Sequence, residues 1–447
     1  MLEIPISFLA PGQVSDQTYY SKSGEVIIKK NVVITPQFIA ALKQQNIESI
    51  YAEGSSDDEE LNNILFPEID ESSISDSATS TSTFLPNLQA GKEGFIELIK
   101  GSINTNLDRL ISERKTEDKP SGPAYRENAS RMKRSERTTT YKSDVISGYD
   151  DALAKTKTIL NNLTNGQSVS TELIRNIVVK FMKLFLTDRD ILLNLSLQKP
   201  NDTDYLYSHS LNTCLLSINI AAAYGYNETQ ITEIGMGALL HDVGMLLVPK
   251  EIRFKQSRPT EDEWFEIQKH PLLGLYLLEK IPRLPEPVSL VAYQVHEREN
   301  GKGYPKQRSS RLIHNYAKVV AVADVFEALS SPRSYREANL PYKAMEMVIR
   351  MTRQGLISGE FVKALLEYSS LFPIGSIVEL SNNCLAKVVQ SNGTSFAKPS
   401  VCVLTDSKGN ILSEEDQYTE NLSENTSIQI IKAHRSNYFS NDPMLGF

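Results

Sequence analysis

The amino-acid sequence predicts a mainly α-helical protein with a small α+β unit at the N-terminus and a small β unit near the C-terminus. From Asp144 to about residue 368, apolar residues recur mostly at intervals of three, four or seven, the spacing of amphipathic helices. After Phe372 and Pro373, short apolar runs alternate with turns that contain Asn and Gly, which is typical of antiparallel strands. At 447 residues, the chain has room for about three domains.

The N-terminal unit is expected over residues 1–54. A turn cluster at 21–24 precedes apolar runs at 26–28 and 32–34, which we expect to be strands. Thr35 followed by Pro36 is a helix-start signal and predicts a helix over 37–45, with a returning strand over 47–51. The unit has no catalytic motif, so we expect a sensory or docking domain for a signalling partner, with plain structural packing as the alternative.

The rest of the chain divides by composition. We expect a flexible acidic, Ser/Thr-rich linker over 55–90, because few apolar residues there can offset the entropy of ordering the chain. A helical region over 91–187 contains a polar loop over 115–142. The main helical domain is expected over 188–370, the β extension over 371–434 and a tail over 435–447. Within the extension we expect strands at 377–380, 386–389 and 400–404.

The polar loop carries a cluster of basic residues: Arg131, Lys133, Arg134 and Arg137. These side chains could contact a nucleotide or an acidic partner. A solvated loop between helices is the favoured interpretation, because most charge runs form solvated surface.

Composition excludes several classes of protein. A formal net charge of -8 argues against a general electrostatic grip on a nucleic-acid polymer or an anionic membrane. Three cysteines without motif spacing exclude a disulfide framework and a cysteine-based zinc site, and they suit a reducing compartment. We find neither a signal peptide nor an apolar run long enough to span a membrane, and expect a cytoplasmic protein.

Histidine and aspartate side chains at five places suit a shared metal centre. Successive places are 32, 29, 26 and 28 residues apart, or about one helix plus a connection, so each helix could deliver one ligand. A single such histidine would more often be a core residue with a hydrogen-bond partner, but the whole set favours a metal. The residues are His209, His241 with Asp242, His270, His296 and Asp324.

The mixture of imidazole and carboxylate predicts the type of cofactor. Such ligands together suit a divalent transition-metal pair, iron or manganese first, with zinc as an alternative. Asp324 adds to this expectation because it follows the apolar run 319–323, where an unpaired carboxylate would be costly to bury.

The motifs that carry these residues resemble the HD-GYP family, a subgroup of the HD phosphohydrolases whose members are bacterial phosphodiesterases that linearise cyclic di-GMP. They occur in the family's order over about residues 190–370: HS (209–210), LLHDVG (239–244), KHP (269–271), HERENGKGYP (296–305), VAVADVFEAL (320–329) and RSYR (333–336). The resemblance implies an HD-superfamily helical bundle. The N-terminal unit and the β extension also resemble accessory parts that such proteins carry.

The resemblance also implies how the metals are held. One metal would be bound by His209, His241, Asp242 and Asp324. Asp242 would bridge to a second metal, which His270 and His296 would also bind. His241 and Asp242 would then be the catalytic pair, at the centre of in-line attack on a phosphodiester.

The same resemblance assigns the substrate contacts. Gly303 would permit the tight turn of the GYP loop, and Tyr304 would stack on a guanine or support the wall of the site. Arg333 and Arg336 would contact phosphate through their planar guanidinium groups, with a surface ion pair as the alternative.

Four positions depart from the family pattern. Met245 stands where the family has a lysine, Val295 replaces the first histidine of HHE, and Asn300 replaces an aspartate. Tyr205 occupies the place of a glutamate found in members with three metals, so a trinuclear centre is not expected. The second metal site is therefore short of one ligand.

Three functions compete on this evidence. The favoured one is a metal-dependent phosphodiesterase that hydrolyses cyclic di-GMP, with activity weakened by the substitutions. The second is a catalytically degenerate receptor for cyclic di-GMP or a protein partner. The third is a phosphohydrolase for another nucleotide, against which the intact GYP motif counts. Helical faces over 144–186 could form a homodimer or could equally pack on the core.

Overall fold

The computed structural model describes residues 2–5, 15, 18–30, 32–45, 47, 49–52, 105–113, 119–130, 132, 136–189, 191–196, 205–331, 338–393, 395–413, 415–425 and 427–434. The expected linker over 55–90, the tail over 435–447 and the arginines Arg333 and Arg336 lie outside these ranges. The described residues belong to two compact units, and each is described by itself.

The first unit contains a small antiparallel sheet with strand order β1-β4-β2-β3 and one helix. Its elements are β1 (Leu2–Pro5), β2 (Tyr19–Tyr20), β3 (Val26–Ile28), α1 (Pro36–Gln44) and β4 (Ser49–Ala52). Helix α1 begins as predicted, because the Thr35 hydroxyl oxygen accepts a hydrogen bond from the Phe38 N–H at 3.2 Å. Of the strand expected at 32–34, only Val33 forms a β-bridge in the described residues; Val32 and Val33 are exposed, and Ile34 reaches the core.

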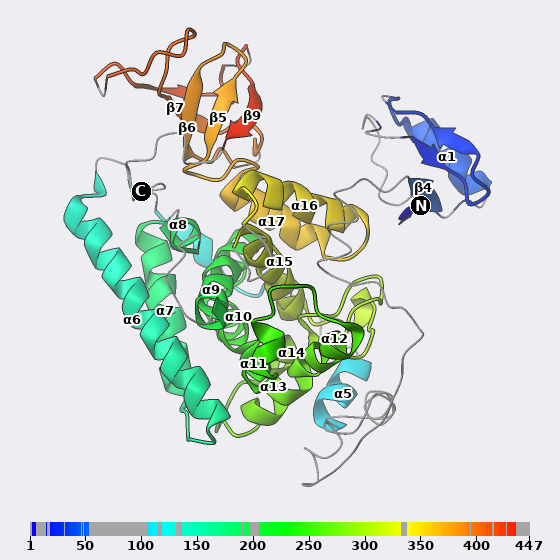
Figure 1. Ribbon diagram of the computed structural model, residues 1–447, viewed down its shortest axis with the longest axis vertical. Helices are drawn as coiled ribbons and strands as arrows, with labels where there is room; N and C mark the ends of the chain where they lie inside the picture. The colour runs from blue at the N-terminus through cyan, green and yellow to red at the C-terminus, as the bar shows by residue number, and fades with distance from the viewer. Residues whose placement is uncertain are drawn as a thin grey trace. The chain divides into compact units, whose positions relative to one another are not determined.

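The second unit holds the main helical bundle (Figure 1). Its α-helices are α5 (Thr105–Ser112), α6 (Thr139–Thr164), α7 (Thr171–Thr187), α8 (Ile191–Ser196), α9 (Tyr205–Tyr224), α10 (Glu228–Leu240), α11 (Lys250–Arg253), α12 (Glu261–Gln268), α13 (His270–Leu278), α14 (Glu286–Gln294), α15 (Asn315–Ser330), α16 (Pro341–Arg353, up to residue 348 in this unit) and α17 (Gly359–Ser369). Short 3-10 helices are η2 (Tyr125–Asn128), η4 (Val243–Leu247) and η5 (Ser310–Leu312).

Helix α9 is the centre of this bundle. Its residues from Leu206 to Ala222 are buried on every face, which is typical of a helix surrounded by others. It packs against α10, α15 and α17, and the first two of these also contribute residues to the candidate site. The central position of α9 therefore places its N-terminal turns, with His209, in the interior.

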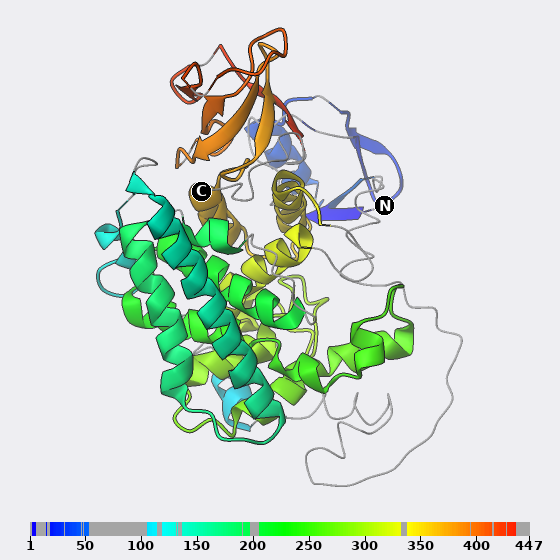
Figure 2. The same cartoon turned by 60° about the vertical axis from the view of Figure 1, so that its left-hand side comes forward.

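Helices α6 and α7 lie side by side along one flank (Figure 1, Figure 2). Most of their apolar positions face inwards; Tyr149 and Phe181, for example, are buried. Helix α6 starts at Thr139, inside the stretch expected to be a polar loop, with Thr138 as its N-cap. The apolar faces over 144–186 therefore pack largely within this unit, and the homodimer remains a prediction.

Arg137 is neither a nucleotide contact nor a solvated loop residue. Its Nε and Nη2 donate to the two carboxylate oxygens of Asp188 at 2.7 and 2.6 Å. Asp188 is fully buried at the end of α7 and also accepts a hydrogen bond from Tyr141 at 3.3 Å. The two residues tie the segment before α6 to α7, so Arg137 has a structural role in the described fold.

The β extension is an antiparallel sheet with strand order β8-β7-β6-β5-β9. Its strands are β5 (Ile377–Leu380), β6 (Leu385–Gln390), β7 (Ser400–Val403), β8 (Tyr418–Asn421) and β9 (Ile430–His434). The first three match the predicted strands to within a residue. The predicted fold class, mainly helical with small sheets towards each end, is confirmed. No helix in the described ranges is both long and apolar enough to cross a bilayer.

Candidate metal centre

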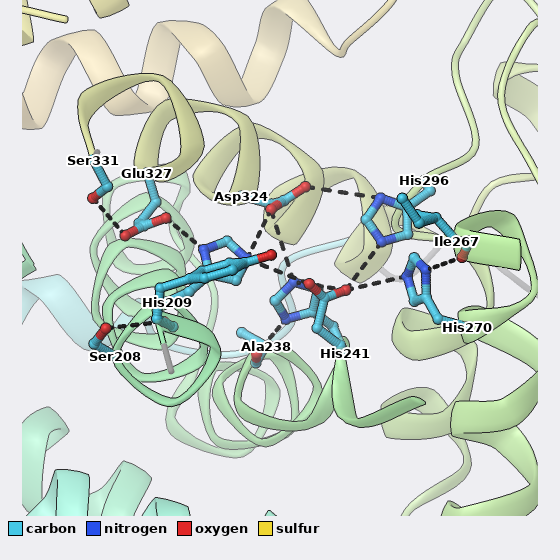
Figure 3. Close-up of polar contacts among 12 residues, drawn as sticks. Ser208, His209, Ala238, His241, Ile267, His270, His296, Asp324, Glu327 and Ser331 are labelled. Carbon is cyan, nitrogen blue, oxygen red and sulfur yellow. Dashed lines mark hydrogen bonds and ion pairs between the residues drawn. The ribbon is translucent and has the colours of Figure 1, made fainter. Parts of the chain in front are cut away.

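Six side chains that the sequence predicted as metal ligands lie together in the interior of the helical unit, and Figure 3 labels five of them. They lie on or directly next to five helices: α9, α10, α13, α14 and α15. His209 lies near the start of α9, His241 caps the end of α10 and is followed by Asp242, His270 begins α13, His296 follows α14, and Asp324 lies within α15.

Asp242 lies at the centre of the cluster. Its Oδ1 is 3.2 Å from Nε2 of both His270 and His296 and 3.4 Å from Nε2 of His241. Its Oδ2 is 3.5 Å from Nε2 of His209. The possible ligand atoms form two groups that share this aspartate, one with His209 and His241 and one with His270 and His296.

Asp324 closes the cluster from the side of α15. Its Oδ1 lies 3.2 Å from Nε2 of His209 and 3.8 Å from Nε2 of His241. Its Oδ2 lies 3.9 Å from Nδ1 of His296. It thus lies nearer to the first group than to the second.

Hydrogen bonds on the outer side of the cluster determine which ring nitrogen of His241 and His270 carries the proton. Nδ1 of His241 and of His270 each lie 2.7 Å from a backbone carbonyl, of Ala238 and Ile267 respectively (Figure 3). Only an N–H can satisfy such a carbonyl, so the proton is assigned to Nδ1, and Nε2 keeps its lone pair. Among the described residues, both Nε2 atoms are buried without a hydrogen-bond partner.

This arrangement fits divalent metals. Histidine ligands usually have Nδ1–H held by a hydrogen-bond acceptor and Nε2 turned towards the metal, as His241 and His270 do here, and the buried carboxylates would supply counter-charge. The Nε2 atoms of His241 and His270 approach Asp242 without a hydrogen bond, which would be unfavourable unless a cation lay between them.

A residue that we did not predict orients His209. Oε2 of Glu327 lies 2.5 Å from Nδ1 of His209, and its Oε1 accepts a hydrogen bond from the Ser331 hydroxyl at 2.7 Å (Figure 3). Glu327 is almost fully buried. It lies three residues after Asp324 in an apolar run. Because a glutamate is rarely buried unless it is paired, its place in this run was a sequence signal for a buried hydrogen-bond partner.

The electrostatics of the site keep its carboxylates ionised. Burial alone would raise the pKa of Asp242, but the surrounding imidazoles, His241 first, hold it well below the usual range. The pKa of Asp324 is also held well below its usual range, because the nearby imidazoles of His209 and His241 outweigh the effect of burial. Burial, together with the nearby His270, lowers the pKa of His296 to about 4, so this imidazole is neutral at pH 7.

The GYP loop supports His296 from behind. The Tyr304 ring stacks on the His296 ring, with the centroids 5.0 Å apart and an angle of 8° between the planes. The backbone N–H of Tyr304 donates a hydrogen bond to the His296 carbonyl at 3.1 Å. A Cβ on Gly303 would overlap the backbone of Glu297 and Arg298, so only glycine permits this close approach. The structure therefore gives Tyr304 the wall-supporting arrangement, while its stacking on a guanine remains a prediction.

Trp264 lies beside this loop. It is the only tryptophan of the chain, and its half-buried ring meets the Tyr304 ring edge-on with centroids 5.9 Å apart. It was not predicted as a site residue, because nothing in its local sequence connects it to the GYP motif.

The structure shows the contacts or burial of three of the four residues that depart from the family pattern. Met245 packs in an apolar cluster with Leu206 and Val248, so its side chain takes part in the core. Val295 is fully buried at the end of α14. Oδ1 of Asn300 accepts a hydrogen bond from the Lys302 N–H at 3.0 Å, a contact that an aspartate could also make.

Comparisons with known proteins agree with this architecture. A family described as an HD domain matches residues 198–360, and one described as a KOW domain associated with HD domain matches residues 377–442. The cyclic di-GMP phosphodiesterase PA4108 of Pseudomonas aeruginosa is 29% identical over 247 residues, which are 55% of this chain and 59% of that protein.

Two further relatives match shorter stretches. The cyclic di-GMP phosphodiesterase response regulator RpfG of Xanthomonas campestris is 39% identical over 120 residues, 27% of this chain and 32% of that protein. The 3'3'-cGAMP-specific phosphodiesterase 2 of Vibrio cholerae is 30% identical over 152 residues, 34% of this chain and 29% of that protein. The chain thus spans less than two thirds of the length of each of these relatives. Together with the motif series, these similarities show an HD domain over residues 198–360 and support the resemblance of the chain to the HD-GYP family.

Proposed function

We propose that this protein is a metal-dependent phosphodiesterase that hydrolyses cyclic di-GMP in bacterial second-messenger signalling. The observation that carries the proposal is the buried cluster of four imidazoles and two carboxylates in two groups that share Asp242. Most of the relatives are named cyclic di-GMP phosphodiesterases, which supports the same substrate class.

The cofactor in this proposal is a pair of divalent cations, iron or manganese, because mixed imidazole and carboxylate ligands suit these metals. His209, His241 and Asp324 would hold one cation, His270 and His296 the other, and Asp242 both. When bound, such a pair supplies Lewis acidity towards the phosphoryl group and an activated water at neutral pH.

The residues of the chain have separate tasks in this proposal. Asp242 stays ionised and fixes the distance between the two groups of ligands. His241 and His270 hold their protons on Nδ1 against backbone carbonyls, so their Nε2 atoms stay available as ligands. The surrounding helices exclude bulk water, which strengthens every charge interaction in the site.

Substrate binding is assigned to residues around the mouth. Tyr304 and Gly303 would shape the wall through the GYP loop, and Arg333 and Arg336 would pair with phosphate oxygens.

The three cysteines are free and buried, which is consistent with a reducing compartment, and we place the protein in the cytoplasm. A signalling partner of the N-terminal unit remains a prediction.

The test is turnover by the purified full chain, loaded anaerobically with ferrous iron or manganese. Cyclic di-GMP and 3'3'-cGAMP are supplied separately, and the products are separated by chromatography. We expect cyclic di-GMP to be cleaved and Asp242→Ala to lose all cleavage, whereas Asp150→Ala, an exposed aspartate of α6, retains it.

A receptor without turnover is the second candidate, because Met245 and Val295 replace a cation and a ligand of the family pattern. Binding of cyclic di-GMP by the metal-loaded protein without any cleavage would support the receptor and refute the enzyme. Cleavage of 3'3'-cGAMP alone would overturn the substrate assignment but not the reaction class.

A further inference from the structure

Helix α5 is docked on the helices that carry the second group of ligands. Leu107 and Ile111 are only 4% and 2% exposed. They pack in one apolar cluster with four residues of α13 and α14: Leu272, Leu275, Leu290 and Tyr293. Helix α5 is thus anchored beside the segment that leads to His296.

A nearly buried ion pair joins α5 to the loop that follows the GYP motif. Oδ1 of Asp108 accepts hydrogen bonds from Nη2 of Arg308 and, at 3.1 Å, from the Tyr293 hydroxyl. The Asp108 and Arg308 side chains are 13% and 11% exposed, and the guanidinium lies 4.8 Å from the Tyr293 ring centroid. Nη1 of Arg308 is buried without a hydrogen-bond partner among the described residues, so Asp108 is the main counter-charge of this guanidinium.

The backbone of the same loop is bound to the residue next to His296. The Glu297 carboxylate accepts one hydrogen bond from the Arg308 N–H and another from the Lys306 N–H, each at 2.8 Å. Between them and the metal cluster, Tyr304 stacks on His296. The position of Arg308 is therefore linked to that of His296 through a short series of direct contacts.

We propose that Asp108 is a positioning residue for the second metal site. By holding Arg308, it fixes the turn over 303–308, and this turn keeps His296 directed at Asp242. Without the Asp108 carboxylate, the nearly buried guanidinium would lose the one ion pair that it forms among the described residues and would move towards solvent, and the turn would move with it. The inference rests on the proposed role of His296 as a metal ligand.

The test compares Asp108→Asn, Arg308→Gln and the double variant with the wild type, all as full chains. Glu113→Gln is the matched control, because Glu113 lies at the end of the same helix in an exposed pair with Arg109. Two quantities are measured: hydrogen–deuterium exchange of the Lys306 and Arg308 amides without metal, and the affinity of the weaker Mn²⁺ site by titration. Arg308→Gln removes the buried cation itself, so it carries the test if Asp108→Asn does not fold.

We expect exchange of these two amides to accelerate about tenfold in both single variants, because their hydrogen bonds to Glu297 open more often. The weaker Mn²⁺ site should lose about tenfold in affinity, the usual effect of removing support behind a ligand. The double variant should be no worse than the worse single variant, because the two residues act as one unit. Glu113→Gln should behave like the wild type.

A lower melting temperature in Asp108→Asn and Arg308→Gln, with unchanged amide exchange and unchanged Mn²⁺ affinity, would reduce the pair to an anchor for α5 and overturn the inference. A wild type that binds no second Mn²⁺ would also overturn it. Neither readout depends on turnover. A wild type that binds two Mn²⁺ but leaves cyclic di-GMP intact would therefore refute the proposed function alone.

Discussion

At the scale of single residues, the orientation of His209 depends on a carboxylate behind it. Glu327 fixes the proton of His209 on Nδ1, 2.5 Å away, and Ser331 in turn holds the other oxygen of Glu327. A negative partner on the far side of an imidazole raises the basicity of the metal-facing nitrogen. Glu327 should therefore contribute to metal affinity without contacting the metal.

We predict that Glu327→Gln weakens Mn²⁺ binding at the site of His209 by about tenfold, because a neutral amide polarises the imidazole less. The measurement is a Mn²⁺ titration followed by electron paramagnetic resonance. Glu346→Gln is the control, since this glutamate forms a partly exposed pair with Lys343 at 3.2 Å. Equal affinities in the two variants would show that Glu327 only fills space.

At the scale of elements, the site depends on the close approach of η4 to α13. Gly244 follows Asp242 by two residues and lies against the start of α13, where a Cβ would overlap the carbonyl oxygen of His270. The glycine of the HDVG motif therefore allows Asp242 and His270 to meet. Met245, the next residue, anchors η4 through the apolar cluster that it shares with Leu206.

Gly244→Ala should destabilise the fold by about 1–3 kcal/mol, because the added methyl group pushes two backbones apart. It should also weaken the metal site of His270. The matched control is Gly274→Ala on the opposite side of the same contact, where a Cβ would meet Gly244 N at an ordinary 3.7 Å. This control should be neutral or up to about 1 kcal/mol more stable, since alanine favours a helix. Urea unfolding of both variants checks the prediction, and equal stabilities would contradict it.

At the scale of the whole molecule, local patterns predicted the fold class and most elements. Strand β5 occupies residues 377–380 as expected, because its apolar run ends at a turn. Strand β8 was not foreseen, because residues 418–421 are polar and at least partly exposed and show no apolar alternation. The run at 32–34 is reduced to one β-bridge residue, Val33, because an apolar run alone does not say which of its residues find a partner strand.

The proximity of the six histidine and aspartate side chains could be predicted because they belong to five recognisable motifs on or next to successive helices. What the sequence could not predict were contacts between residues outside these motifs. Asp108 and Arg308 are 200 positions apart. Arg137 and Asp188 are 51 positions apart. Pairs of this kind arise only when the tertiary fold brings two surfaces together, and no local spacing encodes them.

The central claim is that one aspartate joins two metal sites in a single buried cluster. The most direct measurement is the number of Mn²⁺ ions bound per full-length chain, by equilibrium titration with folding checked by circular dichroism. We predict two ions for the wild type and for the control Asp150→Ala, one for His270→Ala and none for Asp242→Ala. Two ions retained by Asp242→Ala, or fewer than two in the wild type, would contradict the account.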